Sequence, residues 1–192
     1  MNAFYALGLR YLQVDDTCWT ALCDKNARQG YIDLGFDIPT MLHQWAGIFN
    51  GFLEGKPADL TVSMHACRGN YKSTYCFEGA YDFVAPYLFG EVKLDALFLE
   101  YDDERSGSFE PLKYIKNQFV VLGLFTSKRP ELEDKEVIKA RVNEAAKYVP
   151  LDRLCISTQC GFASTEDGNK LTEEEEFNKL KHIIAISKEI WK

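Results

Sequence analysis

Short runs rich in β-branched and aromatic residues alternate along the chain with longer segments whose apolar residues recur every three or four positions. The short runs predict buried strands. The middle ones are almost continuously apolar, which is typical of parallel strands covered on both faces. The predicted strands are Tyr11–Asp15, Leu60–His65, Ala96–Glu100, Phe119–Phe125 and Arg153–Ser157.

Helical segments separate these strands. A helix is predicted over Ile38–Leu53, because Asp37 suits the N-cap and Pro39 suits the first turn. A second is predicted over Lys135–Tyr148, and a last one begins at the capping box of Thr172–Glu175. The apolar residues of the last helix recur at helical spacing, at Phe177, Leu180, Ile183, Ile184 and Ile190. Repeated strand and helix indicate a parallel α/β fold.

The number of these units is too small for a closed barrel. A (β/α)8 barrel needs eight strand–helix units and roughly 250 residues, whereas this chain has 192 residues. Residues Asn2–Gly8 resemble the end of a helix that leads into the first strand. We therefore expect residues 1–192 to form a single domain, either an open sheet or part of a barrel whose first units are absent.

Composition narrows the classes of function. The net charge of −7 argues against nucleic acid or an anionic membrane as the main partner, since both require a basic surface. No segment is apolar for long enough to span a bilayer and no signal peptide is evident, so a cytoplasmic location is expected. In that reducing compartment the six cysteines are expected to be core residues, nucleophiles or metal ligands rather than disulfides.

Polar clusters follow three of the predicted strands, at the end where α/β folds place their active sites. His65 and Cys67 lie at the end of the second strand and point to the same side if the strand continues. Glu100 ends the third strand, and Cys160 lies just beyond the fifth. Two sulfurs, an imidazole and a carboxylate suit a tetrahedral zinc ion. Residue types alone leave open whether these side chains bind metal or only support the structure.

The segments SMHACRGN, FLEYDDERSG and CISTQCGFAS resemble the zinc-site segments of the cobalamin-independent methionine synthase family, and YLQVDD resembles its substrate-contacting strand end. The chain is most similar to the shorter bacterial members. The resemblance implies the last five units of a (β/α)8 TIM barrel, with Zn²⁺ on His65, Cys67, Glu100 and Cys160. It also implies that Asp15 binds the amino group of homocysteine, which accepts a methyl group from 5-methyltetrahydrofolate. The expected macromolecular partner is the missing first half of the barrel or a second copy of the chain.

One position departs from the family pattern. Where methionine synthase has the histidine of an Asp-Ile-His-Ser-Pro segment, this chain has Lys128, which would act as a general acid or bind a carboxylate of the donor. Arg68 and Arg105 would either grip a substrate carboxylate or support the acidic residues after the third strand. Two alternatives to folate-dependent methyl transfer remain: a non-catalytic zinc- and thiol-binding protein, and a homocysteine methyltransferase with a different donor. A uroporphyrinogen-decarboxylase-like enzyme is disfavoured, because such a reaction needs no metal-bound thiolates.

Overall fold

The computed structural model describes all residues, 1–192. Its five strands are β1 (Tyr11–Asp16), β2 (Thr61–Ala66), β3 (Ala96–Glu100), β4 (Phe119–Phe125) and β5 (Leu154–Thr158). Its helices are α1 (Asn2–Ala6), α2 (Cys18–Ala21), α3 (Lys25–Asp33), α4 (Ile38–Leu53), α5 (Ala85–Leu88), α6 (Lys135–Ala145) and α7 (Glu173–Ile190). Short 3₁₀ turns lie at Tyr81–Phe83, Glu104–Ser106, Glu110–Tyr114 and Leu151–Arg153.

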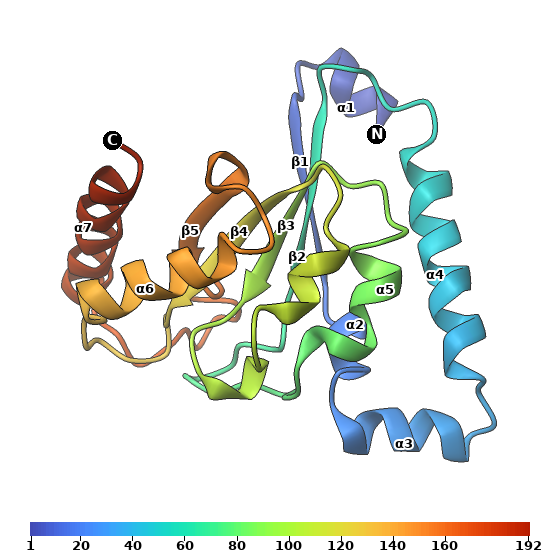
Figure 1. Ribbon diagram of the computed structural model, residues 1–192, viewed down its shortest axis with the longest axis horizontal. Helices are drawn as coiled ribbons and strands as arrows, with labels where there is room; N and C mark the ends of the chain where they lie inside the picture. Colours follow the sequence, from blue (N-terminus) through green and yellow to red (C-terminus); the bar gives the residue numbers. More distant parts are fainter.

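The strands form one parallel sheet in the order β1-β2-β3-β4-β5, so each strand pairs with its neighbour in the sequence (Figure 1). This confirms the predicted parallel α/β fold. The predicted strand ends differ from the observed ones by at most one residue. The sequential order brings the carboxyl ends of all five strands to the same edge, which is the edge expected to carry the chemistry.

Helix boundaries follow local hydrogen bonds. The Asp37 carboxylate accepts from the Thr40 N–H at the start of α4, and α7 begins with the predicted capping box between Thr172 and Glu175. The prediction for α6 was too long, because this helix ends at Ala145 rather than Tyr148. The sequence reaches Pro150 shortly afterwards, and the residue before a proline is disfavoured in helical geometry.

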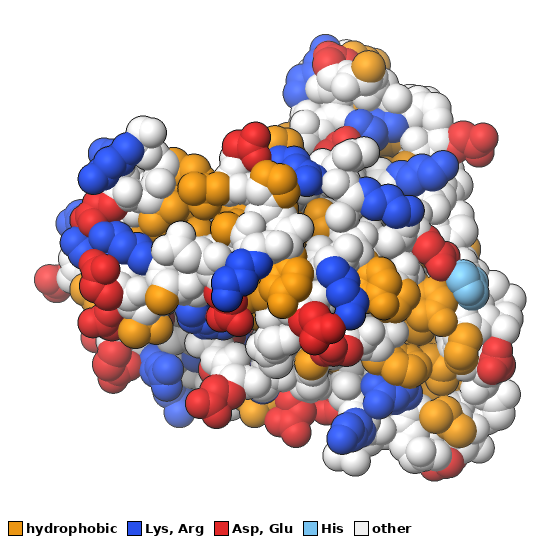
Figure 2. Space-filling model, viewed as in Figure 1, with side chains coloured by type: hydrophobic (Ala, Val, Ile, Leu, Met, Phe, Trp, Pro, Cys, Tyr) orange, Lys and Arg blue, Asp and Glu red, His pale blue; other side chains and the backbone are white.

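Successive side chains of each strand point to opposite faces of the sheet. One face packs against the helices and contributes fully buried residues such as Val62, Met64 and Leu97 to a single connected apolar core. The opposite face borders an open hollow of about 780 Å³, lined by residues that include Tyr11, Phe98 and Phe119. Positive and negative side chains are interspersed over the face shown in Figure 2. No helix combines the length and apolar character needed to cross a bilayer.

The two helices at opposite ends of the molecule, α4 and α7, leave apolar side chains uncovered (Figure 1). On α4, Ile48 and Phe52 are exposed and border a small apolar pocket with Val14 of β1. On α7, the exposed residues include two of the predicted apolar positions, Phe177 (58% exposed) and Ile184 (53%). The buried positions of α7 are instead Lys179 and Ile186. Each end helix therefore has a second apolar stripe that nothing within this chain covers.

Glycine at position 123 permits close contact between β4 and β5. A Cβ atom there would lie 2.7 Å from the Gln159 Cα and 3.0 Å from the Leu99 carbonyl oxygen. The β4–β5 pairing is irregular between Gly123 and Phe125, where it reaches Thr158. Because glycine has no Cβ, the backbone after β5 can turn in over the end of β4.

Candidate metal centre

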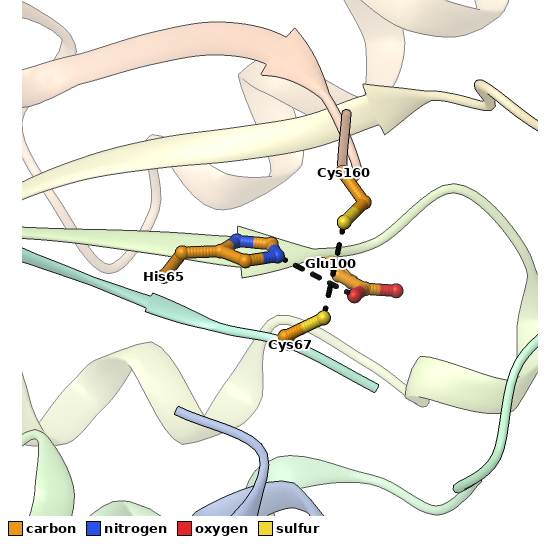
Figure 3. A group of neighbouring side chains, drawn as sticks. All are labelled: His65, Cys67, Glu100 and Cys160. Atoms are coloured by element: carbon orange, nitrogen blue, oxygen red, sulfur yellow. Dashed lines mark hydrogen bonds and ion pairs between the residues drawn. The ribbon is translucent and has the colours of Figure 1, made fainter. Parts of the chain in front are cut away.

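Four side chains from three strand ends converge on one point (Figure 3). His65 lies in β2, Cys67 follows this strand directly, Glu100 ends β3, and Cys160 follows β5 by two residues. Their donor atoms all lie within 4.8 Å of one another. The Cys67 and Cys160 Sγ atoms are 3.8 Å apart, and His65 Nε2 lies 3.7 Å from Glu100 Oε1. The structure thus brings together the four residues that the sequence analysis selected.

The surroundings of this cluster suit a cation. His65 Nε2 is buried but has no hydrogen-bond partner, and both cysteines are free thiols. A buried ring nitrogen without a partner is costly, so it needs a ligand that the protein itself does not supply. The cluster contains only donor types that metals accept, with no lysine or arginine among the four.

The four donors also influence one another's protonation. Contact with Cys67 and His65 lowers the pKa of Cys160 to about 4 against the effect of burial, while contact with Cys160 together with burial raises the pKa of Cys67. Burial raises the pKa of Glu100 to about 7. Burial favours the neutral ring of His65, but the neighbouring Cys160 and Glu100 outweigh it and raise its pKa. The cluster therefore holds protons that a bound cation would displace.

Glu100 has protein partners on both carboxylate oxygens. Oε1 accepts the Arg68 backbone N–H at 2.7 Å, and Oε2 accepts Arg105 Nη2 at 3.0 Å. Its backbone N–H donates to the Tyr81 hydroxyl at 3.0 Å. These bonds hold the Glu100 carboxylate in place beside His65. Hydrogen bonds from residues that are not themselves ligands orient the ligands of metal centres in the same way.

The family model described as the catalytic domain of cobalamin-independent synthase matches residues 10–189. The chain belongs to this family. It is 49% identical over 194 residues to the uncharacterized protein YxjH of Bacillus subtilis and 51% identical over 196 residues to its YxjG. Both matches cover 100% of this chain but only 52% and 51% of the relatives. The chain thus spans about half the length of the curated relatives it matches.

Two solved structures of the family type share the fold. One, from Listeria monocytogenes, is provisionally named a vitamin-B12 independent methionine synthase; it is 40% identical, with a TM-score of 0.77 over 100% of this chain and 51% of its own. The other is a B12-independent methionine synthase from Shewanella sp. W3-18-1 in complex with selenomethionine. It is 18% identical, with a TM-score of 0.73 over 98% of this chain and 50% of its own, and so supports the fold alone. Together with the parallel sheet, these matches confirm the predicted relation to half of a methionine-synthase-type barrel.

The residues predicted to bind substrate occupy different environments in this member of the family. Asp15 pairs in register with His65, so its carboxylate lies on the hollow side of the sheet beside the metal centre. Arg68 is fully buried instead, with its guanidinium carbon 4.5 Å from the centre of the Tyr81 ring and all three of its side-chain nitrogens without a hydrogen-bond partner. Its side chain therefore packs away from solvent, and its backbone N–H is the group that reaches Glu100.

Arg105 and Lys128 both take part in ion pairs with acidic residues after β3. Arg105 pairs with Glu100, Asp102 and Asp103, which is the supporting arrangement considered in the sequence analysis. The Lys128 amine pairs with the Asp102 carboxylate, and both side chains are largely buried. Burial alone would raise the pKa of Asp102, but Lys128 and Arg105 lower it below its usual value.

Sequence reasoning missed a set of polar residues that join the loops around the metal centre. Their members are Asn70, Ser127, Gln159 and Asn169. Asn70 and Gln159 lie within the segments SMHACRGN and CISTQCGFAS but were assigned no role there. No local signal marks Asn169, which is 99 residues from its partner Asn70.

Proposed function

We propose that the chain carries the zinc site of a methyltransferase that transfers a methyl group to a thiol, with homocysteine as the acceptor and 5-methyltetrahydrofolate as the donor. The observation that carries this proposal is the convergence of His65, Cys67, Glu100 and Cys160 in a member of the cobalamin-independent synthase family. A cytoplasmic location remains a prediction from the sequence.

The spacing of the donors supports zinc. In a tetrahedral site with Zn–S bonds of about 2.3 Å, two sulfur ligands stand roughly 3.8 Å apart. The Sγ atoms of Cys67 and Cys160 are separated by 3.8 Å. Two thiolates with an imidazole and a carboxylate form a soft-to-borderline donor set that zinc accepts and that magnesium or calcium does not. When bound, zinc would lower the pKa of an incoming thiol, so that a reactive thiolate forms at neutral pH.

The residues around the donors would bind and orient the substrate. Asp15 offers a carboxylate for an amino group next to His65 on the open side of the sheet. Glu100 accepts the Arg68 N–H and Arg105 without any metal, so its buried carboxylate would still have partners if it were not a ligand.

The environment of Lys128 favours the second candidate, a homocysteine methyltransferase with a different donor. A general acid must release a proton near neutral pH. The Lys128 amine is already engaged in an ion pair with the buried Asp102 carboxylate. Proton donation by Lys128 to a departing folate nitrogen therefore requires that this pair first separate. The non-catalytic zinc- and thiol-binding protein remains the third candidate, and it predicts binding without turnover.

We propose further that the open edges of the sheet pair with additional polypeptide. A (β/α)8 barrel has eight strands and this sheet has five, which leaves three to be supplied. The uncovered apolar stripes of α4 and α7 flank these open edges, and unpaired edge strands are prone to associate with other chains. This additional polypeptide would correspond to the half of the relatives that lies outside the region matched by this chain.

Metal analysis and X-ray absorption test the proposal. Protein purified without chelator should contain one zinc per chain, and addition of homocysteine should add a sulfur to the zinc shell. Methyl transfer is then assayed with labelled 5-methyltetrahydrofolate. Transfer would establish the folate donor, whereas its absence would exclude this donor and leave the different-donor methyltransferase and the binding protein. The Cys67→Ser variant should lose zinc. The control variant Cys155→Ser changes a cysteine within β5, the strand that precedes Cys160, and should keep zinc. Stoichiometric zinc in the Cys67→Ser variant would exclude the proposed ligand set.

A further inference from the structure

The four donors of the metal centre are not positioned by the same means. His65 and Glu100 lie within β2 and β3, and Cys67 comes directly after β2, so the hydrogen-bonded sheet fixes their places. Cys160 lies in the loop between β5 and α7, beyond the last paired residue of the sheet. The Gln159 N–H still donates to the Phe125 carbonyl at 2.8 Å, so backbone pairing with β4 ends one residue before Cys160. The position of the Cys160 side chain therefore also depends on contacts made by the loop.

Hydrogen bonds tie the residues on both sides of Cys160 to the loop after β4. The Ser127 N–H donates to Gln159 Oε1 at 2.6 Å, and Gln159 Nε2 donates to Ser127 Oγ at 2.9 Å. On the other side, the Gly161 carbonyl accepts Ser127 Oγ at 2.8 Å and Asn70 Nδ2 at 2.7 Å. Ser127 and Gln159 are buried, so these bonds are protected from competing water.

Asn169 completes this hydrogen-bond network from the loop between β5 and α7, the loop that also carries Cys160. Its Nδ2 donates to Asn70 Oδ1 and to the Ser127 carbonyl, both at 2.9 Å. Its Oδ1 accepts the Ser73 N–H at 2.9 Å, and its own backbone N–H donates to the Phe162 carbonyl at 3.0 Å. One side chain thus bonds the loops after β2 and β4 while its backbone holds the loop after β5.

We propose that Asn169 is a positioning residue for the metal centre. It acts through Asn70, Ser127 and Gln159, and we call these four residues together the loop clasp. The loop clasp holds the Cys160 thiol beside Cys67, one residue beyond the point where backbone pairing with β4 ends. This inference rests on the proposed metal centre, but the placement of Cys160 can be measured without any metal.

The first test therefore uses protein stripped of metal. The Sγ atoms must move from 3.8 Å to about 2.05 Å to form a disulfide, so the rate of Cys67–Cys160 oxidation by diamide reports how closely the loop holds the two thiols. Diamide is reduced to its hydrazine form as the two thiols lose two electrons and two protons. The Asn169→Ala variant should oxidise at least tenfold more slowly than the wild type. Thr165→Ala, in the same loop but with no side-chain bond to the clasp, should oxidise at the wild-type rate.

The second test measures affinity for zinc by competition with a chelator, and the absorption of Co²⁺ as a probe of thiolate coordination. Loss of an outer hydrogen bond typically weakens metal binding by about 10–100-fold, and we expect that range for Asn169→Ala. Asn169→Asp should fail as well, because it replaces the donating amide with an acceptor facing Asn70 Oδ1 and the Ser127 carbonyl. In a Cys160→Ser background, Asn169→Ala should cause no further loss, since the ligand it positions is already gone.

These measurements separate the two proposals. If the wild type binds no zinc, the proposed function fails, while the oxidation rates still decide the role of Asn169. The role of Asn169 is excluded if Asn169→Ala oxidises at the wild-type rate, if its effect on zinc adds to that of Cys160→Ser, or if the wild type forms no Cys67–Cys160 disulfide. Should Asn169→Ala fail to fold, Ser127→Ala removes two bonds of the same clasp with the loss of one oxygen, and the same criteria apply to it.

Discussion

The Sγ atoms of Cys67 and Cys160 lie 3.8 Å apart although 93 residues separate them in the sequence. The distance is much longer than the roughly 2.05 Å of a disulfide, so the two atoms are not bonded to each other. It is short enough for both to bind one ion or to become bonded after a small movement. We therefore predict that metal binding and oxidation compete for this pair of thiols.

Metal-free protein should form this disulfide on treatment with hydrogen peroxide, which is reduced to two molecules of water as the two thiols are oxidised. Bound zinc should protect the pair, because its ligand thiolates are engaged with the metal. Mass spectrometry would detect a loss of two hydrogens and a peptide linked through Cys67 and Cys160. Cys18 and Cys76 are exposed and serve as internal controls for general oxidation. Equal oxidation of the pair with and without zinc would contradict this prediction.

Replacement of Arg105 by methionine should weaken both the fold and the metal centre. The Arg105 side chain is 5% exposed and pairs with Glu100 and Asp102, each 1% exposed. Removal of one partner from a buried charge cluster costs about 3–5 kcal/mol, and we expect the free energy of unfolding to fall by about 3 kcal/mol in urea denaturation. Zinc affinity should fall about 10–100-fold through loss of the bond to Glu100.

The matched control for Arg105 is Lys113→Met. Lys113 pairs with Glu110 on the surface, and such exposed pairs contribute little to stability. This variant should leave zinc affinity unchanged. An Arg105→Met protein with wild-type stability and zinc affinity would show that Glu100 is oriented by other means.

Lys179 of α7 should stabilise the loop after β4. Its fully buried amine donates to the Glu131 carbonyl at 2.7 Å and to Glu133 at 3.1 Å, while Glu133 accepts the Thr126 N–H at 2.8 Å. Lys179→Met should lower the free energy of unfolding by about 1–3 kcal/mol, because it removes the bonds that the buried amine donates to the Glu131 carbonyl and to the partly buried Glu133 carboxylate. Thermal and urea denaturation would measure this loss. The control variant Lys181→Met replaces an exposed lysine of the same helix and should have little effect in both measurements.

The chain on its own should self-associate through its uncovered apolar stripes. Placing a charge in the stripe of α7 by Ile184→Lys, or in that of α4 by Ile48→Lys, should shift sedimentation toward the monomer. Lys113→Glu makes a charge change at an exposed position on neither helix and should not produce this shift. Wild-type protein that sediments as a monomer at tens of micromolar would exclude association through these stripes.

Much of this architecture could be predicted because its signals are local. Apolar runs and capping residues place the strands to within one residue, and the shared edge of a parallel sheet predicts that His65, Cys67, Glu100 and Cys160 meet. The remainder depends on tertiary contacts that no short pattern encodes. Burial of the Arg68 guanidinium contradicts the usual exposure of arginine. On α7 the predicted apolar positions divide between two faces, and the sequence does not distinguish them. Ile183 and Ile190 pack against the core, whereas the exposed positions are Phe177, Leu180 and Ile184.

The contact between Gly123 and the backbone after β5 also limits how this site can change over evolutionary time. A Cβ atom added at Gly123 would collide with the Cα of Gln159, the residue directly before Cys160. We therefore expect Gly123, which has no functional group of its own, to tolerate as few substitutions as a donor residue. In a saturation screen selected for zinc-dependent growth, the tolerance profile of Gly123 should resemble that of Cys160 rather than that of other strand residues.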